Sequence, residues 1–218
     1  DSRLSGGTLL EWIADEMSRE GINVTDMGLT STPAMFMTTK TEGYMFDGAV
    51  MVTASHLPYN RNGYKFFTPD GGVEASDIKD MIALAESDKH SGLTPAGVEK
   101  GEFMSVYAKR LADMIRQACN SDKPLEGLKV VVDAGNGAGG FYAEDVLLPL
   151  GADITGSRYL NPDGRFPNHI PNPENEEAMA SITEAVLGSN ADLGIIFDTD
   201  VDRAGAVLSD GSELNRNR

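Results

Sequence analysis

The sequence predicts an α/β protein made of two successive α/β domains, with mixed, mostly parallel sheets sandwiched by helices. Short apolar, β-branched runs alternate with amphipathic segments along the 218 residues, which is typical of alternating strands and helices. Several runs are apolar without interruption, as burial on both faces of a parallel sheet requires. A short polar segment with a proline at 120–127 interrupts the pattern, which then resumes. We therefore expect one domain over residues 1–121 and a second over residues 122–218.

In the first domain, helices are predicted where apolar residues recur three and four positions apart, over 8–14, 75–86 (with Ile78, Met81, Ile82 and Ala85 on one face) and 103–119. Another helix should begin at 32–33, with Thr32 as its cap and Pro33 at its first position. Strands are predicted at the short apolar runs 22–27, 49–52 and 64–67, the second of them buried in a parallel sheet. Asn62-Gly63 indicates a tight turn, and the polar segment 88–99 predicts a loop.

The second domain repeats this alternation. Strands are predicted over 129–133, 152–156, 193–197 and 205–208, and helices over 141–150 and 174–187. A glycine-rich turn at 135–140 connects the first strand to the first helix, and residues 158–173 form a long loop rich in proline and asparagine.

Charge excludes two classes of partner. The chain has 34 acidic and 18 basic residues, a formal net charge of −16, and therefore lacks the basic surface that nucleic acid or an anionic membrane requires. A phosphorylated substrate would need locally concentrated cations, either side chains or a metal. The single cysteine, Cys119, excludes an internal disulfide framework and suits a reducing compartment. With no apolar run of membrane-spanning length and no signal-like start, we expect a cytoplasmic location.

A serine and a histidine follow directly on one predicted strand. In 49–68, AVMVTASHLPYNRNGYKFFT, the apolar run ends before Ser55 and His56, and the chain returns in a second strand that carries Lys65. The carboxyl end of a buried strand is where open α/β sheets place their chemistry. We therefore predict a functional loop here.

This loop resembles the active-site serine loop of the α-D-phosphohexomutases, the phosphoglucomutase/phosphomannomutase family. The usual form in that family is T(A/G)SHNP followed by NG(F/I)K. The matching residues are Ser55, His56, Pro58, Asn62, Gly63 and Lys65. Leu57 departs from the pattern, because the family commonly has asparagine there. The resemblance implies that Ser55 carries a phosphoryl group.

Further segments resemble the same family in the same order. They are DSRLSG at the amino end, GLTSTPA at 28–34, VVVDAGNGAGG at 130–140, and the DG.FP…PNP loop at 163–173. The resemblance implies a four-domain enzyme of which this chain supplies most of the first two domains. On this basis we expect a first strand and the family's arginine loop upstream of Asp1, and more of the second domain beyond Arg218.

Three aspartates follow the buried run 193–197, at Asp198, Asp200 and Asp202. Carboxylates at alternate positions of a loop can turn toward one point, and hard oxygen ligands in that number suit Mg²⁺. The run DTDVDR resembles the family's DGDGDR metal loop and keeps Arg203. Thr199 and Val201 replace glycines, which restricts the backbone.

Two other interpretations compete for these motifs. IIFDTDV also resembles the first motif of haloacid-dehalogenase-like phosphatases. That family needs further lysine and acidic motifs downstream, so this interpretation holds only if the chain continues well past Arg218. Residues 135–140 form a GxGxxG after a strand, with Asp153 about twenty residues on, as in dinucleotide-binding sites. Because the strand ends in Asp133, which is poorly suited to a site beside a pyrophosphate, we interpret this motif as a tight strand-to-helix turn.

The resemblance implies a mutase that interconverts hexose 1-phosphate and hexose 6-phosphate through a phosphoserine and a hexose 1,6-bisphosphate intermediate. The implied catalytic residues are Ser55, His56, Lys65 and Arg203, and the implied ligands of one Mg²⁺ are Ser55, Asp198, Asp200 and Asp202. The partner is a phosphorylated hexose, and the chain alone is expected to turn over poorly. An inactive homologue that serves as a binding or assembly module is the alternative.

Overall fold

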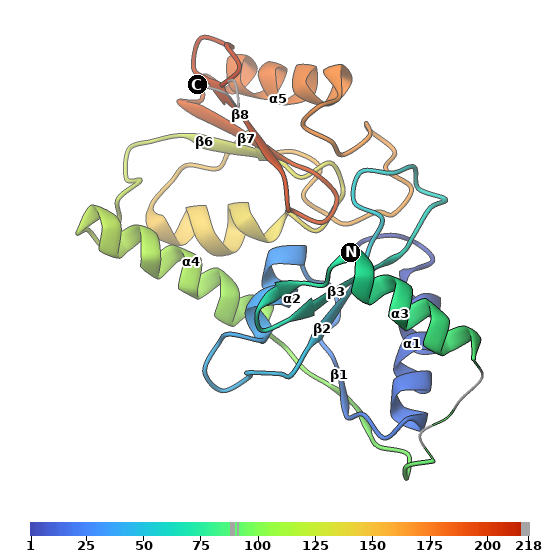
Figure 1. Cartoon of the computed structure of the whole chain (residues 1–218). Coiled ribbons are helices and arrows are strands. Elements are labelled where there is room, and N and C mark those ends of the chain that lie inside the picture. Colours follow the sequence, from blue (N-terminus) through green and yellow to red (C-terminus); the bar gives the residue numbers. More distant parts are fainter. Residues whose placement is uncertain (88–89, 91, 215–218) are drawn as a thin grey trace.

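The computed structural model describes residues 1–87, 90 and 92–214. Parts of the predicted loop at 88–99 and of the predicted domain over 122–218 lie outside the described residues. The chain forms two α/β halves that lie side by side (Figure 1). Among the described residues, no helix is long and apolar enough to cross a membrane.

Within its described residues, the first half holds two small sheets and four helices. Its elements are α1 (Gly6–Arg19), β1 (Val24–Asp26), α2 (Thr32–Thr38), β2 (Ala49–Val52), β3 (Tyr64–Thr68), β4 (Gly71–Gly72), α3 (Ala75–Glu86), β5 (Val98–Lys100) and α4 (Met104–Cys119). β1 pairs with β5 in parallel, whereas β2, β3 and β4 form an antiparallel sheet.

The second half is a three-stranded sheet with helical segments on both faces. Its elements are β6 (Val130–Asp133), a π-helical segment η1 (Tyr142–Leu147), a 3₁₀ turn η2 (Leu148–Leu150), α5 (Glu176–Ser189), β7 (Leu193–Phe197) and β8 (Ala204–Leu208). β7 is central, parallel to β6 and antiparallel to β8.

The sheet of the second half is packed by apolar side chains on both faces. On one face, Ile182 and Val186 of α5 are fully buried against Val131, Ile196 and Val207 of the three strands. A second apolar cluster on the other face joins the strands to η1. Each aliphatic side chain buried in this way contributes about 1.5–3 kcal/mol relative to exposure. The loops that leave the ends of β6 and β7 therefore start from fixed positions.

The predicted α/β class with mixed sheets is confirmed, but several local predictions are wrong. Ala49–Val52 is not in a parallel sheet, because the chain returns within eleven residues and pairs antiparallel as β3. Residues 152–156 form no strand beyond one bridge between Lys129 and Asp153. The loop prediction for 88–99 misses β5. The helix predicted over 141–150 is instead η1 and η2.

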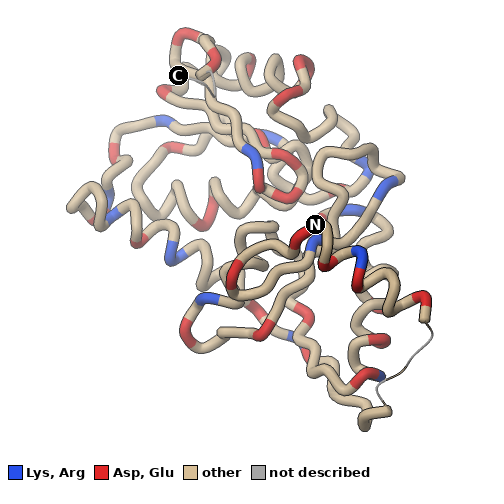
Figure 2. The backbone as a smooth tube through the Cα atoms, in the orientation of Figure 1, with Lys and Arg blue, Asp and Glu red and all other residues tan. Residues whose placement is uncertain are grey.

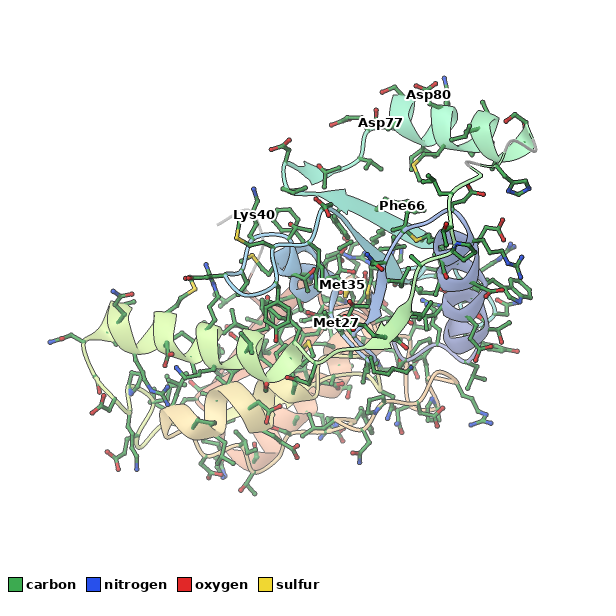
Figure 3. All side chains as sticks on the ribbon, turned by 90° about the horizontal axis from the view of Figure 1, so that it is seen from below. Met27, Met35, Lys40, Phe66, Asp77 and Asp80 are labelled. Atoms are coloured by element: carbon green, nitrogen blue, oxygen red, sulfur yellow. The ribbon has the colours of Figure 1, made fainter. Side chains whose placement is uncertain are left out.

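Two smaller differences concern helices. Ser31, not Thr32, caps α2: its hydroxyl accepts a hydrogen bond from the Ala34 amide at 3.2 Å. α3 has the predicted bounds, but it has no buried residue, and Figure 3 shows Asp77 and Asp80 on a helix at the edge of the molecule. Its apolar face does not contribute to the core. Asn62-Gly63 likewise forms no tight turn, and Gly63 instead pairs with Thr53 at the base of a longer loop.

α4 contacts both halves. Ala108 and Ala112 pack against Val146 and Leu150 of the second half, while Phe103, just before the helix, packs in the core of the first half. The domain boundary at residues 121 and 122 stays a prediction.

Candidate active site

The loop between β2 and β3 holds Ser55 in an unusual backbone conformation. Ser55 has a φ of 52°, in the left-handed region that residues other than glycine rarely adopt. Its backbone amide donates to the Thr53 hydroxyl at 2.8 Å. A residue held in this region needs support from its surroundings. That support comes from a segment more than fifty positions earlier in the chain.

Arg3 holds the serine loop by its carbonyl oxygens. Its Nη2 donates to the carbonyls of Ser55 and Leu57 at 2.5 and 2.7 Å, and its Nη1 donates to those of Pro58 and Arg61 at 2.8 and 3.0 Å. The fifth donor, Nε, lies 3.2 Å from a carboxylate oxygen of Asp1. All five N–H donors of the guanidinium thus have acceptors. Arg3 as a whole is only 3% exposed, so these bonds are protected from water.

The loop after β7 brings three carboxylates together. Oxygens of Asp198, Asp200 and Asp202 lie within 4.8 Å of one another. Asp198 and Asp200 are fully buried, and Asp202 is partly exposed. Val201 has a φ of 65°, at one of the two positions where the sequence pattern would favour glycine. The loop therefore keeps a left-handed turn there despite a β-branched residue.

The two loops meet, although more than 140 residues separate them. The Ser55 hydroxyl donates to Asp198 Oδ2 at 3.2 Å and accepts from Arg203 Nη2 at 2.7 Å. The same Arg203 nitrogen lies 2.5 Å from His56 Nδ1, which must therefore be the unprotonated, accepting nitrogen of the ring. Figure 2 shows acidic and basic positions gathered where the loops of the two halves approach.

Lys65 extends from β3 into the acidic loop. Its Nζ lies 2.7 Å from Asp200 Oδ2 and 2.6 Å from Asp202 Oδ2. Thr32, at the start of α2, donates its hydroxyl to the same Asp200 oxygen at 2.5 Å, and its amide donates to the Asp200 carbonyl at 2.8 Å. The first half thus contacts the acidic loop through a serine, a lysine and a threonine.

Burial and charge set the protonation of these groups. Burial, together with the negative charge of Asp200, raises the pKa of Asp198 to about 7. Burial acts in the same direction on Asp200, but hydrogen bonds from Lys65 and Thr32 lower the pKa of Asp200 below its usual value. Although burial opposes it, the two neighbouring carboxylates raise the pKa of Lys65. Lys65 is therefore an ammonium ion at neutral pH.

The acidic loop fits a divalent cation. The Oδ1 of Asp200 is buried and has no hydrogen-bond partner among the described residues, which is costly for a carboxylate oxygen. With three carboxylates in reach of one point, the donors are all hard oxygens of the kind that Mg²⁺ prefers. A buried carboxylate oxygen with no hydrogen-bond partner, in a cluster of three carboxylates, fits the role of a metal ligand.

The glycine-rich turn at 135–140 packs against the acidic loop, and this packing explains its glycines without a bound dinucleotide. A Cβ on Gly137 would lie 2.7 Å from the Thr199 carbonyl oxygen, and the Ala138 amide donates to that oxygen at 2.8 Å. Only glycine permits this approach. Behind the turn, the buried carboxylate of Asp133 accepts from His169 Nε2 at 3.0 Å and from the Ser181 hydroxyl at 2.6 Å. The hydrogen bond from His169 therefore holds the loop at 158–173 against the end of β6, which is a structural role for that loop.

The structure places all seven residues predicted for the site around one point: Ser55, His56, Lys65, Asp198, Asp200, Asp202 and Arg203. Sequence reasoning missed Arg3 and the contact from Thr32. Arg3 lay in a segment noted for its resemblance, but nothing in its spacing indicated that it would contact the serine loop. The sequence pattern predicts Thr32 as the helix cap, but Ser31 caps the helix, and the Thr32 hydroxyl donates a hydrogen bond to Asp200 instead.

Comparison with known proteins gives consistent matches. Residues 1–90 match the family model for phosphoglucomutase/phosphomannomutase alpha/beta/alpha domain I, and residues 105–211 match the model for domain II. A phosphoglucomutase of Neisseria meningitidis serogroup B is 31% identical over 219 residues, which cover 100% of this chain and 45% of that protein. A phosphomannomutase/phosphoglucomutase of Pseudomonas aeruginosa PAO1 is 34% identical over 220 residues, with the same coverage of 100% and 45%.

A crystal structure of a phosphoglucomutase/phosphomannomutase family protein from Burkholderia thailandensis superposes with a TM-score of 0.84 at 28% identity, covering 98% of this chain and 46% of that one. The chain thus spans less than half the length of the relatives it matches. The match over 105–211 includes the DTDVDR loop, which favours the metal-loop interpretation of that motif over the phosphatase one.

Proposed function

The chain belongs to the phosphoglucomutase/phosphomannomutase family, and from this we propose that it supplies the phosphoserine and the metal loop of a phosphohexomutase. The proposed reaction interconverts hexose 1-phosphate and hexose 6-phosphate through a hexose 1,6-bisphosphate. The proposed substrate is a phosphorylated hexose of the glucose or mannose type. Because the chain covers 45% of its relatives, complete turnover is expected to need the rest of such an enzyme.

One observation carries the proposal. The Ser55 hydroxyl lies between a guanidinium and a buried carboxylate of a loop that begins 143 positions later. The carboxylate accepts the hydroxyl proton, while the guanidinium sits beside the same oxygen, where an attached phosphoryl group would present its negative charge. A serine in a general structural role does not need both partners, nor a left-handed backbone that exposes it to them.

The neighbouring side chains have distinct proposed roles. In the transfer, a bond between the Ser55 oxygen and phosphorus breaks as a bond from phosphorus to a sugar hydroxyl oxygen forms. Arg203 would donate to the oxygens of the transferring group. Lys65 would neutralise charge beside it once the acidic loop binds metal. His56 has its ring next to Arg203 and is the candidate to accept the proton of the sugar hydroxyl, because Lys65 is already an ammonium ion.

The residues proposed to hold Mg²⁺ are Asp198, Asp200, Asp202 and the phosphoserine at Ser55. The orphaned Asp200 oxygen supports this donor set. When bound, Mg²⁺ would neutralise phosphoryl charge and make phosphorus more open to in-line attack.

Phosphorylation of Ser55 is the decisive test. The chain is incubated with Mg²⁺ and millimolar hexose 1,6-bisphosphate, and intact-mass spectrometry with peptide mapping measures phosphate on each serine. We expect one phosphate, at Ser55, in the wild type and in Ser105→Ala, and none in Ser55→Ala. Absence of phosphate from the wild type, or its presence in Ser55→Ala, contradicts the proposal and favours the inactive binding module.

Metal binding has a separate readout. Calorimetric titration with Mg²⁺ should show one site in the wild type and in Asp80→Asn, which removes a carboxylate from exposed α3. Asp200→Asn should lose that binding, because an amide offers one neutral oxygen in place of a charged pair of acceptors. Equal Mg²⁺ affinity in Asp200→Asn and wild type would exclude the acidic loop as the site.

A further inference from the structure

The loop at 158–173 belongs to the second half, but it contacts the segment of the first half that holds the serine loop. Gly164 of this loop is buried, and a Cβ at this position would overlap the Ser2 carbonyl oxygen and lie 2.6 Å from the Leu4 amide nitrogen. A residue with a side chain could not approach so closely. The two backbones therefore touch directly beside Arg3.

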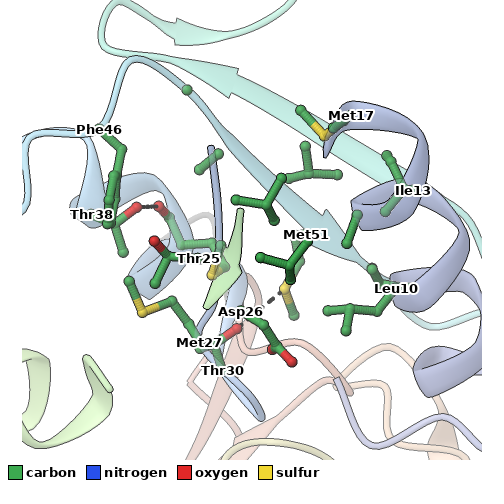
Figure 4. A pocket seen from close by; sticks show the side chains of 18 of the residues that line it. Leu10, Ile13, Met17, Thr25, Asp26, Met27, Thr30, Thr38, Phe46 and Met51 are labelled. Atoms are coloured by element: carbon green, nitrogen blue, oxygen red, sulfur yellow. Dashed lines mark hydrogen bonds between the residues drawn. The ribbon is translucent and has the colours of Figure 1, made fainter. Parts of the chain in front are cut away.

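The ring of Phe166 covers one face of the Arg3 guanidinium. The centre of the ring lies 5.4 Å from the Cζ of Arg3, within the range of a cation–π contact. Arg3 is not among the described residues that line the cavity of about 1290 Å³ between α1, α2, β1 and β2 (Figure 4). The guanidinium is thus packed against an aromatic face and is not exposed to that cavity.

The hydrogen bonds and the ring restrict the guanidinium in different directions. Its five N–H donors lie in one plane, and their acceptors, four of them carbonyls of the serine loop, surround the edge of that plane. Such bonds fix the group within its plane but oppose tilting only weakly, because a hydrogen bond tolerates moderate departures from linearity. A ring against the face opposes tilting and keeps water away from the bonds.

The backbone of Phe166 is itself in an unusual conformation. Its φ is 49°, in the left-handed region, which is rare for a residue with a bulky side chain. Its amide donates to the Asp163 carbonyl at 3.0 Å, which closes a turn over the two residues between them. A residue in this conformation persists only when its surroundings hold it there.

Asn136 supplies that support from the glycine-rich turn at 135–140. Its backbone amide and carbonyl and its side-chain nitrogen and oxygen each make one hydrogen bond of 2.7–2.9 Å to the loop at 158–173, with partners in Tyr159, Asp163, Asn161 and Asn168 respectively. The next two residues of the same turn contact the backbone of Thr199 in the acidic loop. One turn therefore supports both the acidic loop and the loop that presents Phe166.

We propose that Phe166 is a positioning residue for Ser55. Held in place by Asn136, it fixes the plane of the Arg3 guanidinium, and Arg3 holds the serine loop so that the Ser55 hydroxyl faces the acidic loop. The second half thereby holds both loops of the site, the acidic loop directly and the serine loop through Phe166 and Arg3. The effect on phosphoryl transfer rests on the proposed function, whereas the effect on the serine loop does not.

The test replaces Phe166 by leucine, which keeps an apolar side chain but removes the aromatic face. Nuclear magnetic resonance measures hydrogen exchange at the amides of Ser55, Leu57 and Arg61, each of which donates a hydrogen bond within the loop. We expect their exchange to accelerate roughly fivefold or more, as the loss of a desolvated cation–π contact implies, with exchange in β6 and β7 unchanged. Phe166→Tyr, which keeps the aromatic face, should exchange as wild type does.

Phe141→Leu is the matched control. Phe141 is another half-buried phenylalanine of the second half, and its ring centre lies 6.2 Å from that of Tyr107 and 6.0 Å from that of Tyr142. This variant should leave exchange in the serine loop unchanged. Gly164→Ala, whose Cβ would displace the loop from the segment beside Arg3, should instead reproduce the acceleration seen in Phe166→Leu.

Three results of the exchange experiment overturn the proposal. They are unchanged exchange of the three serine-loop amides in Phe166→Leu, equal acceleration in Phe141→Leu, and a uniform acceleration that includes β6 and β7. Exchange in Phe166→Tyr that matches Phe166→Leu also overturns it, because the aromatic face would then have no effect.

A kinetic measurement separates positioning from a loss of stability. The chain is incubated with Mg²⁺ and increasing hexose 1,6-bisphosphate, and intact-mass spectrometry follows phosphate on Ser55. In Phe166→Leu the maximal rate should fall roughly fivefold or more, because the serine is less often directed at the acidic loop. The bisphosphate concentration that gives half the maximal rate and the Mg²⁺ affinity should stay as in wild type and in Phe141→Leu.

An equal maximal rate in Phe166→Leu and wild type overturns the positioning role. Absence of phosphate from the wild type contradicts the proposed function instead, and amide exchange then decides by itself whether Phe166 fixes the serine loop.

Discussion

Replacing Arg3 by methionine is expected to lower the free energy of unfolding by about 3–5 kcal/mol. The guanidinium makes five hydrogen bonds, four of them to carbonyls of the serine loop. Bonds to a charged donor contribute about 1.5–3 kcal/mol each when fully buried, and about 0.5–1 kcal/mol once the freed carbonyls of this partly exposed loop can be hydrated. Methionine keeps the volume and the apolar stem but no donor, so the loss is mostly that of the bonds.

Urea unfolding followed by circular dichroism measures this loss, and amide exchange over residues 55–61 localises it. The free energy of unfolding of Arg3→Lys should lie between those of wild type and Arg3→Met. An ammonium offers three donors from one atom, whereas the planar guanidinium offers five. Arg19→Met is the matched control: its side chain is 63% exposed on α1, and the change should stay within about 0.5 kcal/mol. A loss below about 1 kcal/mol in Arg3→Met would refute the idea that Arg3 holds the loop.

Three further predictions concern the support of the site. Gly137→Ala should lower the free energy of unfolding in urea by about 1–3 kcal/mol, because the new Cβ would clash with the backbone of Thr199. The control Gly97→Ala, which has open space at its Cβ, should change the free energy of unfolding by less than about 0.5 kcal/mol. Equal losses in the two variants would contradict this prediction. Burial opposes protonation of His169, but Asp133 raises its pKa. The stability that wild type gains over His169→Gln should therefore be full below about pH 6.5 and fall as pH rises through the raised pKa, and a pH-independent difference would exclude this ion pair. In EDTA, Lys65→Met should lower the free energy of unfolding by about 1–3 kcal/mol, a value discounted for the partial exposure of Lys65. Mg²⁺ should restore much of this free energy. The same loss with and without Mg²⁺ would show that no cation replaces the ammonium.

Local patterns predicted most helices and strands, but not how the strands pair. The bounds of α3 and β2 follow from apolar spacing, which acts over a few residues. The antiparallel pairing of β2 with β3 depends on the path of the loop between them, and β5 is a three-residue exposed strand with no apolar signal. η1 is a π-helical segment, for which apolar spacing alone gives no distinct prediction.

The site divides in the same way. Ser55 and the three aspartates were found because each follows an apolar strand, where functional loops are expected, and because their runs resemble known motifs. That the two loops meet is a tertiary fact, which spacing within either motif does not determine. Arg3 is the clearest case: its role consists entirely of bonds to backbone carbonyls, and such bonds require no particular residue type in their acceptors. A sequence pattern has no means of marking them.

The charges of the site indicate why phosphorylation of Ser55 and binding of a divalent cation should favour each other. Three carboxylates face two cations, Lys65 and Arg203, so the acidic loop is close to neutral while Lys65 bridges Asp200 and Asp202. A phosphoserine would add about two negative charges to a partly buried cluster, which the two cations cannot offset. A divalent cation among the carboxylates restores the balance, and it would compete with Lys65 for the same Asp200 side chain. The ammonium would then be free to turn toward the phosphoryl group, so that one lysine would stabilise the metal-free loop and would serve the proposed reaction when metal is bound.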